Sequence, residues 1–146
     1  LGKPVWQLLG LNPQAGPQSC YTLGIDTRDT MLRKMQAMPG WPIYKIKCGT
    51  PNDLETIRFL RTHTTATFRV DANCGWKPEQ VVPMATELKQ LGVEFIEQPL
   101  PVEHWSDMAQ LKPQSPLPLM ADESCPVQAS VERCAAGFHA INIKLV

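Results

Sequence analysis

The sequence lacks several features that would assign it to a specialised class of protein. Its 146 residues carry 14 Lys and Arg against 14 Asp and Glu, so no general attraction to nucleic acid or to an anionic membrane is indicated. No apolar run approaches the roughly 18 residues that a membrane span requires. The amino end also lacks the basic-then-apolar pattern of a signal peptide. These absences exclude the most common nucleic-acid-binding and membrane classes.

The five cysteines likewise follow no recognisable pattern. They are widely spaced, odd in number and without a C-x-x-C pair, which argues against both a disulfide framework and a zinc ribbon. We therefore expect a reducing, cytoplasmic location. The hydrophobic content of 43% and the charged content of 19% are ordinary for a globular protein. A chain of this length can bury the core of one modest domain.

A regular alternation of strand-like and helix-like segments begins at Cys20. Six strands are expected, over residues 21–25, 43–48, 68–72, 95–99, 119–123 and 140–145. Five helices are expected between them, over residues 27–38, 53–61, 78–91, 104–111 and 127–136. Short loops between alternating strands and helices predict an α/β fold with a parallel sheet and right-handed crossovers. Ahead of this region, a short apolar helix over residues 1–11 and a loop over 12–19 are expected.

The strand at 43–48 carries two lysines with one residue between them. Lys45 and Lys47 stand at i and i+2, so both leave the strand on the same face. On a solvated face, which is the more common case for such a pair, they would have no special chemistry. In an enclosed pocket, desolvation and the neighbouring like charge would both disfavour protonation. A lysine held partly neutral at pH 7 is a base that can remove a proton.

An ionisable residue stands near the carboxyl end of every strand from the second onward. In chain order these residues are Lys47, Asp71, Glu97, Asp122 and Lys144. They are separated by one strand–helix unit each time, so all five should lie at the same edge of the sheet, where α/β proteins build their sites. The three carboxylates are hard oxygen ligands that suit Mg²⁺. The pattern therefore predicts a metal site with a lysine on either side.

Simpler interpretations compete with parts of this prediction. A single aspartate after a strand is more often a helix N-cap than a metal ligand. Glu123 competes with Asp122 for the third ligand position, because only one of two neighbouring strand residues faces inward.

Five segments carry a resemblance to a known family. They are Lys45-Ile46-Lys47, Asp71-Ala72-Asn73, Ile96-Glu97-Gln98-Pro99, Ala121-Asp122-Glu123-Ser124 and Ile141-Asn142-Ile143-Lys144-Leu145. Together they closely resemble the enolase superfamily, and within it the muconate-lactonising-enzyme subgroup. The last segment and Thr22-Leu23-Gly24-Ile25-Asp26 look most like dipeptide epimerases of the L-Ala-D/L-Glu type. Among the candidates for the third carboxylate, the family pattern favours Asp122.

The resemblance implies a metal-dependent reaction at a carbon next to a carboxylate. Asp71, Glu97 and Asp122 would hold Mg²⁺, for which Mn²⁺ could substitute. The metal would bind the substrate carboxylate and stabilise the enediolate that forms when the α-proton is lost, as in enolase-superfamily sites generally.

The resemblance also implies a division of roles among the other polar residues. Lys47 would remove the α-proton from one face of the substrate, and Lys144 would return a proton to the opposite face. Lys45 would lower the pKa of Lys47 and lie near the substrate carboxylate. Supporting roles, in orienting the carboxylates or binding substrate, would fall to Asn73, Gln98, Thr22 and Asn142.

The expected function is therefore 1,1-proton transfer on a small carboxylate, most simply the epimerisation of a dipeptide such as L-Ala-L-Glu. A muconate-type cycloisomerase or an o-succinylbenzoate synthase would use the same lysines and metal. A non-catalytic half-barrel that keeps the ligands without a closed pocket is a further alternative. A homo-oligomer is expected, with neither nucleic acid nor a membrane as a partner.

The length of the chain limits the architecture that it can build. A complete (β/α)₈ barrel typically needs about 250 residues, so we expect residues 20–146 to form only a partial barrel of six strands. Residues 1–19 would be a lead-in from a capping domain that this sequence does not contain. The first and last strands would then be open edges, which are prone to pair with other chains.

Overall fold

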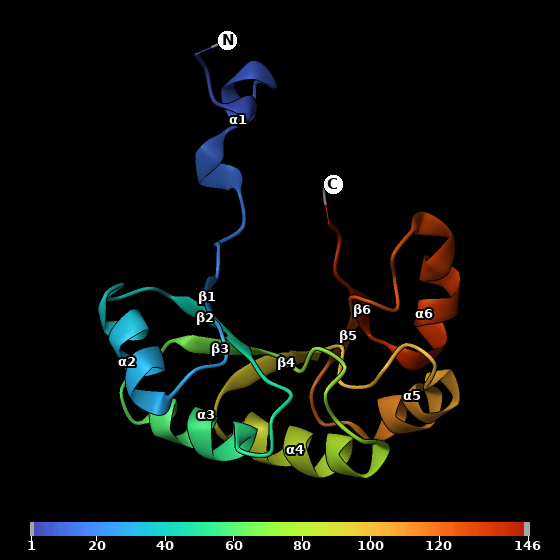
Figure 1. Ribbon diagram of the computed structural model, residues 1–146. Coiled ribbons are helices and arrows are strands. Elements are labelled where there is room, and N and C mark those ends of the chain that lie inside the picture. The colour runs from blue at the N-terminus through green and yellow to red at the C-terminus, as the bar shows by residue number, and fades with distance from the viewer. Residues whose placement is uncertain (1, 145–146) are drawn as a thin grey trace.

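Six parallel strands form one sheet in the computed structural model, which describes residues 2–144 (Figure 1). The strands are β1 (Tyr21–Leu23), β2 (Ile43–Lys47), β3 (Thr67–Asp71), β4 (Val93–Glu97), β5 (Leu119–Ala121) and β6 (Ala140–Ile141). Their spatial order is the same as their order in the chain. Each strand therefore lies beside its neighbour in sequence, as expected for an arc of a (β/α)₈ barrel.

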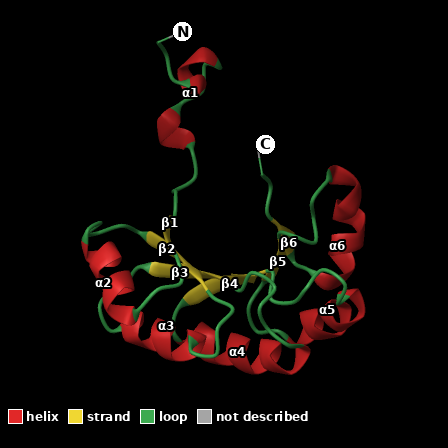
Figure 2. Cartoon of the chain, viewed as in Figure 1, coloured by secondary structure: helices red, strands yellow, loops and turns green. Residues whose placement is uncertain are grey.

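Helices connect the strands and lie along one side of the sheet (Figure 2). They are α2 (Arg28–Gln36), α3 (Asp53–Arg61), α4 (Pro78–Gln90), α5 (Trp105–Leu111) and α6 (Val131–Gly137). The alternation of strands and helices confirms the predicted α/β class and the parallel sheet. No helix within the described residues is both long and apolar enough to cross a membrane.

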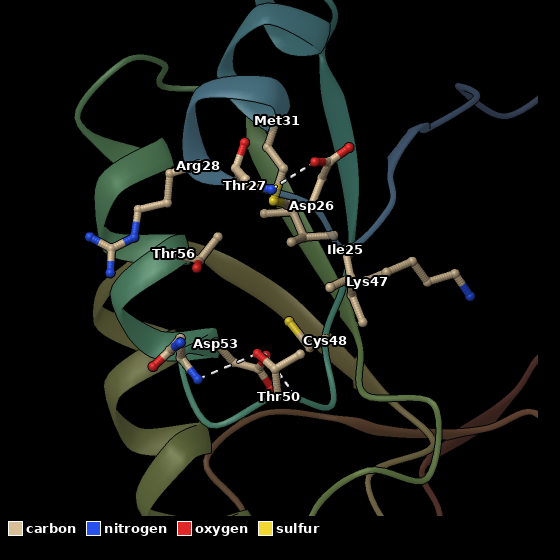
Figure 3. Close-up of a pocket in the computed structure, with 12 residues that line it drawn as sticks. Ile25, Asp26, Thr27, Arg28, Met31, Lys47, Cys48, Thr50, Asp53 and Thr56 are labelled. Atoms are coloured by element: carbon tan, nitrogen blue, oxygen red, sulfur yellow. Dashed lines mark hydrogen bonds between the residues drawn. The ribbon is translucent and has the colours of Figure 1, made fainter.

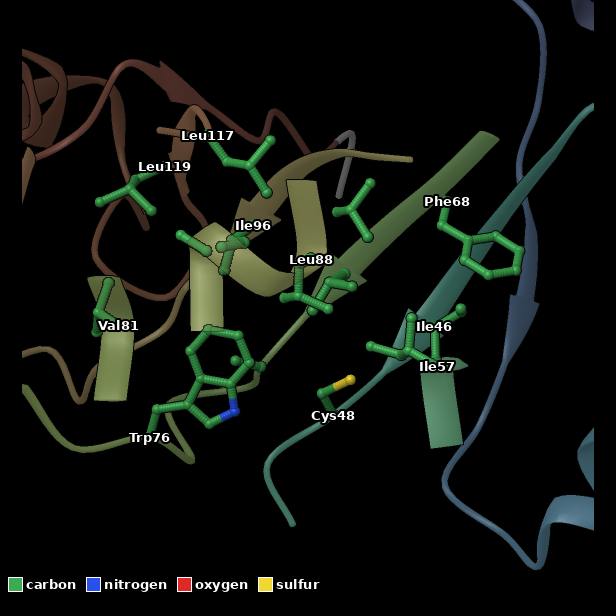
Figure 4. Close-up of a cluster of buried hydrophobic side chains, with 14 of the residues drawn as sticks. Ile46, Cys48, Ile57, Phe68, Trp76, Val81, Leu88, Ile96, Leu117 and Leu119 are labelled. Atoms are coloured by element: carbon green, nitrogen blue, oxygen red, sulfur yellow. The ribbon is translucent and has the colours of Figure 1, made fainter. Parts of the chain in front are cut away.

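The hydrophobic core lies between the sheet and these helices (Figure 4). Ile46, Phe68 and Ile96 come from three different strands, and Ile57 and Leu88 face them from α3 and α4; all five are completely buried. Burial of each such side chain contributes about 1.5–3 kcal/mol. Because residues alternate across a strand, packing Ile46 against the helices directs Lys45 and Lys47 to the other face.

The register of the sheet brings the predicted site residues to one level. Lys47 pairs with Asp71 across β2 and β3, and Asp71 pairs with Glu97 across β3 and β4. An irregularity between Phe68 and Val70 shifts the β3–β4 register by one residue. This shift aligns the last residues of both strands, which places two carboxylates side by side.

Several elements end earlier than the sequence pattern predicted. The strand expected over 119–123 stops at Ala121, and the one expected over 140–145 covers only Ala140–Ile141, while Leu145 is outside the described residues. The chain turns directly after β5, where the Cys125 N–H donates to the Asp122 carbonyl at 2.8 Å. This hydrogen bond is incompatible with continued pairing in the ladder, so Asp122 and Glu123 belong to a loop.

The amino-terminal segment differs most from its prediction. The expected helix over residues 1–11 is reduced to a single turn, α1 (Val5–Leu8), followed by a short 3₁₀ turn, Pro13–Ala15. None of the residues of α1 is buried, and an isolated helix this short gains too little from its few hydrogen bonds to extend. The segment projects away from the sheet (Figure 1).

Candidate active site

Five charged side chains are placed in a row by successive strands of the sheet. Lys47, Asp71 and Glu97 are the last residues of β2, β3 and β4; Asp122 directly follows β5; and Lys144 comes three residues after β6. The carboxylate residues are almost entirely buried, with exposures of 0%, 2% and 7% in chain order. Burial of three carboxylates is costly unless cations compensate their charge.

Lys45 and Lys47 supply part of that compensation. Both ammonium groups contact the same oxygen, Asp71 Oδ2, with Nζ–O distances of 2.9 Å for Lys45 and 2.6 Å for Lys47. Lys45 Nζ also lies 2.8 Å from Glu97 Oε2. Lys45 therefore bridges two carboxylates on adjacent strands, and the Asp71 carboxylate lies between the two lysines.

The pKa values of these groups reflect the pairing. Burial acts to raise the pKa of Asp71, but the hydrogen bonds from Lys47 and Lys45 outweigh it and lower that pKa below its usual value. For Lys45, burial lowers the pKa, but Glu97 and Asp71 together raise it above the usual lysine range. The net effect on Lys45 is opposite to the one expected from desolvation and lysine–lysine repulsion, because the intervening carboxylates dominate.

The other side of the row contains a second ion pair. Lys144 Nζ lies 2.7 Å from Asp122 Oδ1, and this contact raises the pKa of Lys144. Asn142 Nδ2 donates to Glu97 Oε1 at 3.1 Å. Burial raises the pKa of Glu97, and the nearby charges of Asp71 and Asp122 add to that rise. Glu97 is thus close enough to both other carboxylates to be affected by their charge.

The structure distinguishes the two candidates for the third carboxylate. Asp122 is buried and pairs with Lys144, whereas Glu123 is exposed and accepts a 3.5 Å hydrogen bond from Asn73 Nδ2. Asn73 also contacts the site through its main chain, because its N–H donates to Asp71 Oδ1 at 3.0 Å. Its backbone is left-handed, with φ of 45°, which is uncommon for a residue other than glycine.

The remaining predicted residues contact the site in different ways. Thr22 pairs with Lys45 in the strand register and makes no side-chain hydrogen bond within residues 2–144. Gln98 is fully buried, and its Oε1 atom accepts a hydrogen bond from the Asp122 N–H at 3.0 Å. Gln98 therefore contacts the main chain of Asp122 rather than a carboxylate.

Asp53 connects two of the loops that border the site, a role that the sequence did not reveal. Its carboxylate accepts hydrogen bonds from the Gly49 and Thr50 N–H groups and from Trp76 Nε1, at 2.8, 3.0 and 2.9 Å. The loop after β2 is thereby joined to the loop after β3.

A cavity of about 320 Å³ lies beside this part of the site. Figure 3 shows that Lys47 points away from the other lining side chains, while Cys48 lies on the side of Met31 and α2. Burial raises the pKa of the Cys48 thiol well above its usual value, so the thiol stays protonated. The cavity therefore lies mainly on the helix-facing side of β2, and of the five charged residues in the row only Lys47 borders it.

The donor set of the row fits a hard divalent cation in chemistry and charge. Three buried carboxylates at the ends of adjacent strands supply oxygen ligands of the kind that Mg²⁺ prefers. Burial first, and then the charges of Asp71 and Asp122, raise the pKa of Glu97, and a bound cation would offset both effects. Within the described residues, no three acidic, histidine or cysteine side chains converge as a ligand group. Lysine ammonium groups lie against the carboxylates instead, so cation binding requires these lysines to move.

Comparison with known proteins identifies the family. The model of the enolase C-terminal domain-like family matches residues 29–145. The chain belongs to this family. The resemblance to the enolase superfamily that the sequence motifs suggested is therefore confirmed, and the six-stranded sheet corresponds to part of an enolase-type barrel.

Individual relatives of this enolase-type chain include epimerases. An L-Ala-D/L-amino acid epimerase of Maribacter sp. is 53% identical over 145 residues, which cover 99% of this chain and 43% of that protein. A dipeptide epimerase from Cytophaga hutchinsonii, complexed with Mg and the dipeptide D-Ala-L-Val, superposes with a TM-score of 0.83 at 28% identity, covering 95% of this chain and 40% of that one.

A muconate cycloisomerase from Pseudomonas fluorescens has a backbone similar to that of this chain. It superposes with a TM-score of 0.81 at 26% identity, covering 94% of this chain and 41% of that one. The backbone therefore does not separate the two activities. The chain spans less than half the length of each of these proteins.

Proposed function

We propose that this enolase-type chain carries the proton-transfer site of a Mg²⁺-dependent epimerase that acts on a dipeptide such as L-Ala-L-Glu. The observation that carries the proposal is the order of the row. A lysine stands at either end, and three buried carboxylates at the carboxyl ends of consecutive strands lie between them. Two bases that flank one substrate carbon can remove a proton from one face and return it to the other.

The chain's own residues would perform the proton transfers. Lys47, whose side chain is 31% exposed, would remove the α-proton from one face of the substrate. Lys144, which is 59% exposed and lies beyond β6, would deliver a proton to the opposite face. Each lysine now donates to a carboxylate, so releasing that partner is the step that makes it available to substrate.

The three carboxylates would hold the metal. Asp71, Glu97 and Asp122 are the proposed ligands, and a bound Mg²⁺ supplies positive charge that stabilises the negative charge developing on the substrate carboxylate. Lys45 would remain nearby as a second positive group for the same carboxylate. Stabilisation of developing charge by fixed groups is commonly the largest contribution to such a reaction.

A cycloisomerase is the competing activity, because the muconate cycloisomerase superposes almost as well as the dipeptide epimerase. Sequence identity favours the epimerase. The Maribacter epimerase is 53% identical to this chain, whereas the cycloisomerase is 26% identical.

Hydrogen exchange in D₂O tests the proposal directly. The protein is incubated with Mg²⁺ and either L-Ala-L-Glu or L-Ala-D-Glu, and deuterium at the Glu α-carbon is measured by NMR. Exchange from both isomers supports the proposal. Its absence from a folded, Mg²⁺-bound sample would favour a non-catalytic half-barrel.

Lysine variants test the roles of the two bases. Lys47→Ala and Lys144→Ala should each abolish exchange from one isomer and retain it from the other. Lys89→Ala provides the matched control, since Lys89 is exposed at the end of α4 and should leave both exchanges intact. If either site variant exchanges both isomers at the wild-type rate, the two-base assignment is wrong.

A further inference from the structure

Gln98 uses its entire side-chain amide inside the protein. Its Oε1 atom accepts hydrogen bonds from the N–H groups of Asp122 and Ser124, at 3.0 and 3.1 Å. Its Nε2 atom donates to the Leu100 carbonyl and to Ser124 Oγ, both at 2.8 Å. An amide can make two hydrogen bonds through each end, and the residue is fully buried. Gln98 therefore has no polar group left to bind substrate.

The hydrogen bonds of the Gln98 side chain require its backbone to adopt an unfavourable conformation. Its φ is 37°, in the left-handed region, which is unfavourable for residues that carry a Cβ atom. Two main-chain hydrogen bonds fix it there: its N–H donates to the Met120 carbonyl at 2.8 Å, and its carbonyl accepts from the Cys74 N–H at 2.9 Å. Strain of this kind persists where the surroundings require it, and it clusters at functional sites.

Ser124 completes the connection between Gln98 and the loop that carries Asp122. It is only 3% exposed, and its carbonyl accepts a hydrogen bond from the Cys134 thiol of α6 at 3.4 Å. The N–H groups of Asp122 and Ser124, the residues before and after Glu123, are held by one amide oxygen, that of Gln98. Because β5 already ends at Ala121, sheet pairing does not fix Asp122, and Gln98 takes over that task.

We propose that Gln98 and Ser124 are positioning residues that hold the Asp122 carboxylate in place for a divalent cation. The inference rests on the metal site of the proposed function and adds to it. It proposes that two buried residues, which do not themselves bind substrate, orient the proposed metal ligand Asp122. Loss of groups that orient a metal ligand typically lowers metal affinity about 10- to 100-fold.

Mn²⁺ binding, followed by electron paramagnetic resonance of the free ion, tests this without an activity assay. Gln98→Met keeps the size of the side chain and removes all four hydrogen bonds, so Mn²⁺ affinity should fall about 10- to 100-fold. Ser124→Ala removes one acceptor and should lower the affinity less. Gln90→Met, at an exposed position of α4, should bind Mn²⁺ like the wild type.

The same substitutions in an Asp122→Asn background distinguish an effect on the position of Asp122 from a non-specific loss of Mn²⁺ binding. If Gln98 acts through Asp122, then Gln98→Met should cause little further loss once that carboxylate is gone. Circular dichroism establishes which variants are folded, and Ser124→Ala provides the result if Gln98→Met does not fold.

Three outcomes would overturn the positioning role. The first is wild-type Mn²⁺ affinity in a folded Gln98→Met or Ser124→Ala protein. The second is an undiminished loss in the Asp122→Asn background. The third is a wild-type protein that binds no Mn²⁺, which would reject the proposed metal site as well, whereas the first two leave that site standing.

Discussion

The Lys45 ammonium group lies between two metal-ligand candidates and compensates their charge. It contacts Asp71 and Glu97 at 2.9 and 2.8 Å, and its side chain is 18% exposed. An ammonium group at this position performs electrostatically what a bound cation would. The stability of the cation-free protein therefore depends on Lys45, and a divalent cation should relieve that dependence.

Replacing Lys45 with methionine tests this. Lys45→Met retains the apolar stem but leaves two buried carboxylates without their shared partner. Removing one partner of a buried pair costs about 3–5 kcal/mol, and the partial exposure of Lys45 favours the lower end. Mg²⁺ should recover much of the loss, because a ligand that binds only the folded state stabilises it. Urea unfolding with and without Mg²⁺ measures both effects.

Lys34→Met is the matched control for this substitution. Lys34 forms an exposed pair with Asp26 at 3.2 Å, and such surface pairs contribute about 0–1 kcal/mol. The control should therefore unfold almost like the wild type, with no dependence on Mg²⁺. An equal loss of stability in Lys45→Met at all Mg²⁺ concentrations would contradict the counter-ion role.

His139 gives the protein a pH-dependent contact away from the site. Its Nδ1 atom accepts a hydrogen bond from the Leu119 N–H at 3.1 Å, which requires the unprotonated nitrogen. Burial, and then the charge of Lys112, lower the pKa of His139 below its usual value of 6.5. The contribution of the neutral ring is therefore present above about pH 6.5 and is lost as the pH falls through the lower, folded-state pKa.

Comparison with His139→Asn should reveal that contribution. Asparagine does not titrate, so the stability advantage of the wild type over the variant should be larger at pH 7.5 than at pH 5. Urea unfolding at the two pH values provides the measurement. A stability difference that is the same at both would show that folding does not lower the pKa of His139.

At the scale of elements, the sequence was sufficient to predict the sheet but not the ends of its strands. Six apolar segments that alternate with helical patterns predicted the strands and their parallel arrangement. The charged residue near the end of each strand from the second onward predicted which edge of the sheet carries the site. The pairing of Lys45 with two carboxylates was not predictable, since it depends on a register shift between β3 and β4. The contact of Ser124 with Gln98 was not predictable, because the two residues lie 26 positions apart in the chain.

The loops after β2 and β3 are held together by the close approach of two glycines. Gly49 has φ of 114°, and a Cβ atom there would lie 2.9 Å from the Ala72 carbonyl oxygen; a Cβ atom on Gly75 would clash with Gly49 Cα. This contact, together with Asp53, determines the spacing between the loops that follow Lys47 and Asp71.

Gly75→Ala should therefore destabilise the protein, because neither backbone can move away without breaking the hydrogen bonds to Asp53. Overpacking of this kind costs about 1–3 kcal/mol. Gly24→Ala is the control, since a Cβ atom there meets nothing within 4 Å and its φ is not left-handed; it should be neutral or stabilising by about 0.4–1 kcal/mol. Equal unfolding midpoints for the two variants would exclude the glycine contact as a determinant of stability.

At the scale of the whole molecule, residues 2–144 form a sheet with two unpaired edges and an amino-terminal segment with exposed apolar side chains. Within residues 2–144, β1 pairs only with β2, and β6 pairs only with β5. The apolar residues of the amino-terminal segment are between 43% and 69% exposed; they are Val5, Trp6, Leu8, Leu9 and Leu11. Open edges and exposed apolar patches both promote contacts between copies of a chain.

Self-association of the protein should therefore depend on this segment. The double substitution Leu9→Lys and Leu11→Lys removes apolar surface without touching the core, so it should weaken association and leave the free energy of unfolding unchanged. The control, Gln7→Lys with Gln14→Lys, adds the same charge at exposed positions of the same segment and retains the apolar surface. Sedimentation velocity over a range of concentrations compares the three proteins. If the control weakens association as much as the leucine substitutions, charge repulsion and not apolar contact is responsible. If neither does, the sheet edges are the better candidates for the contact.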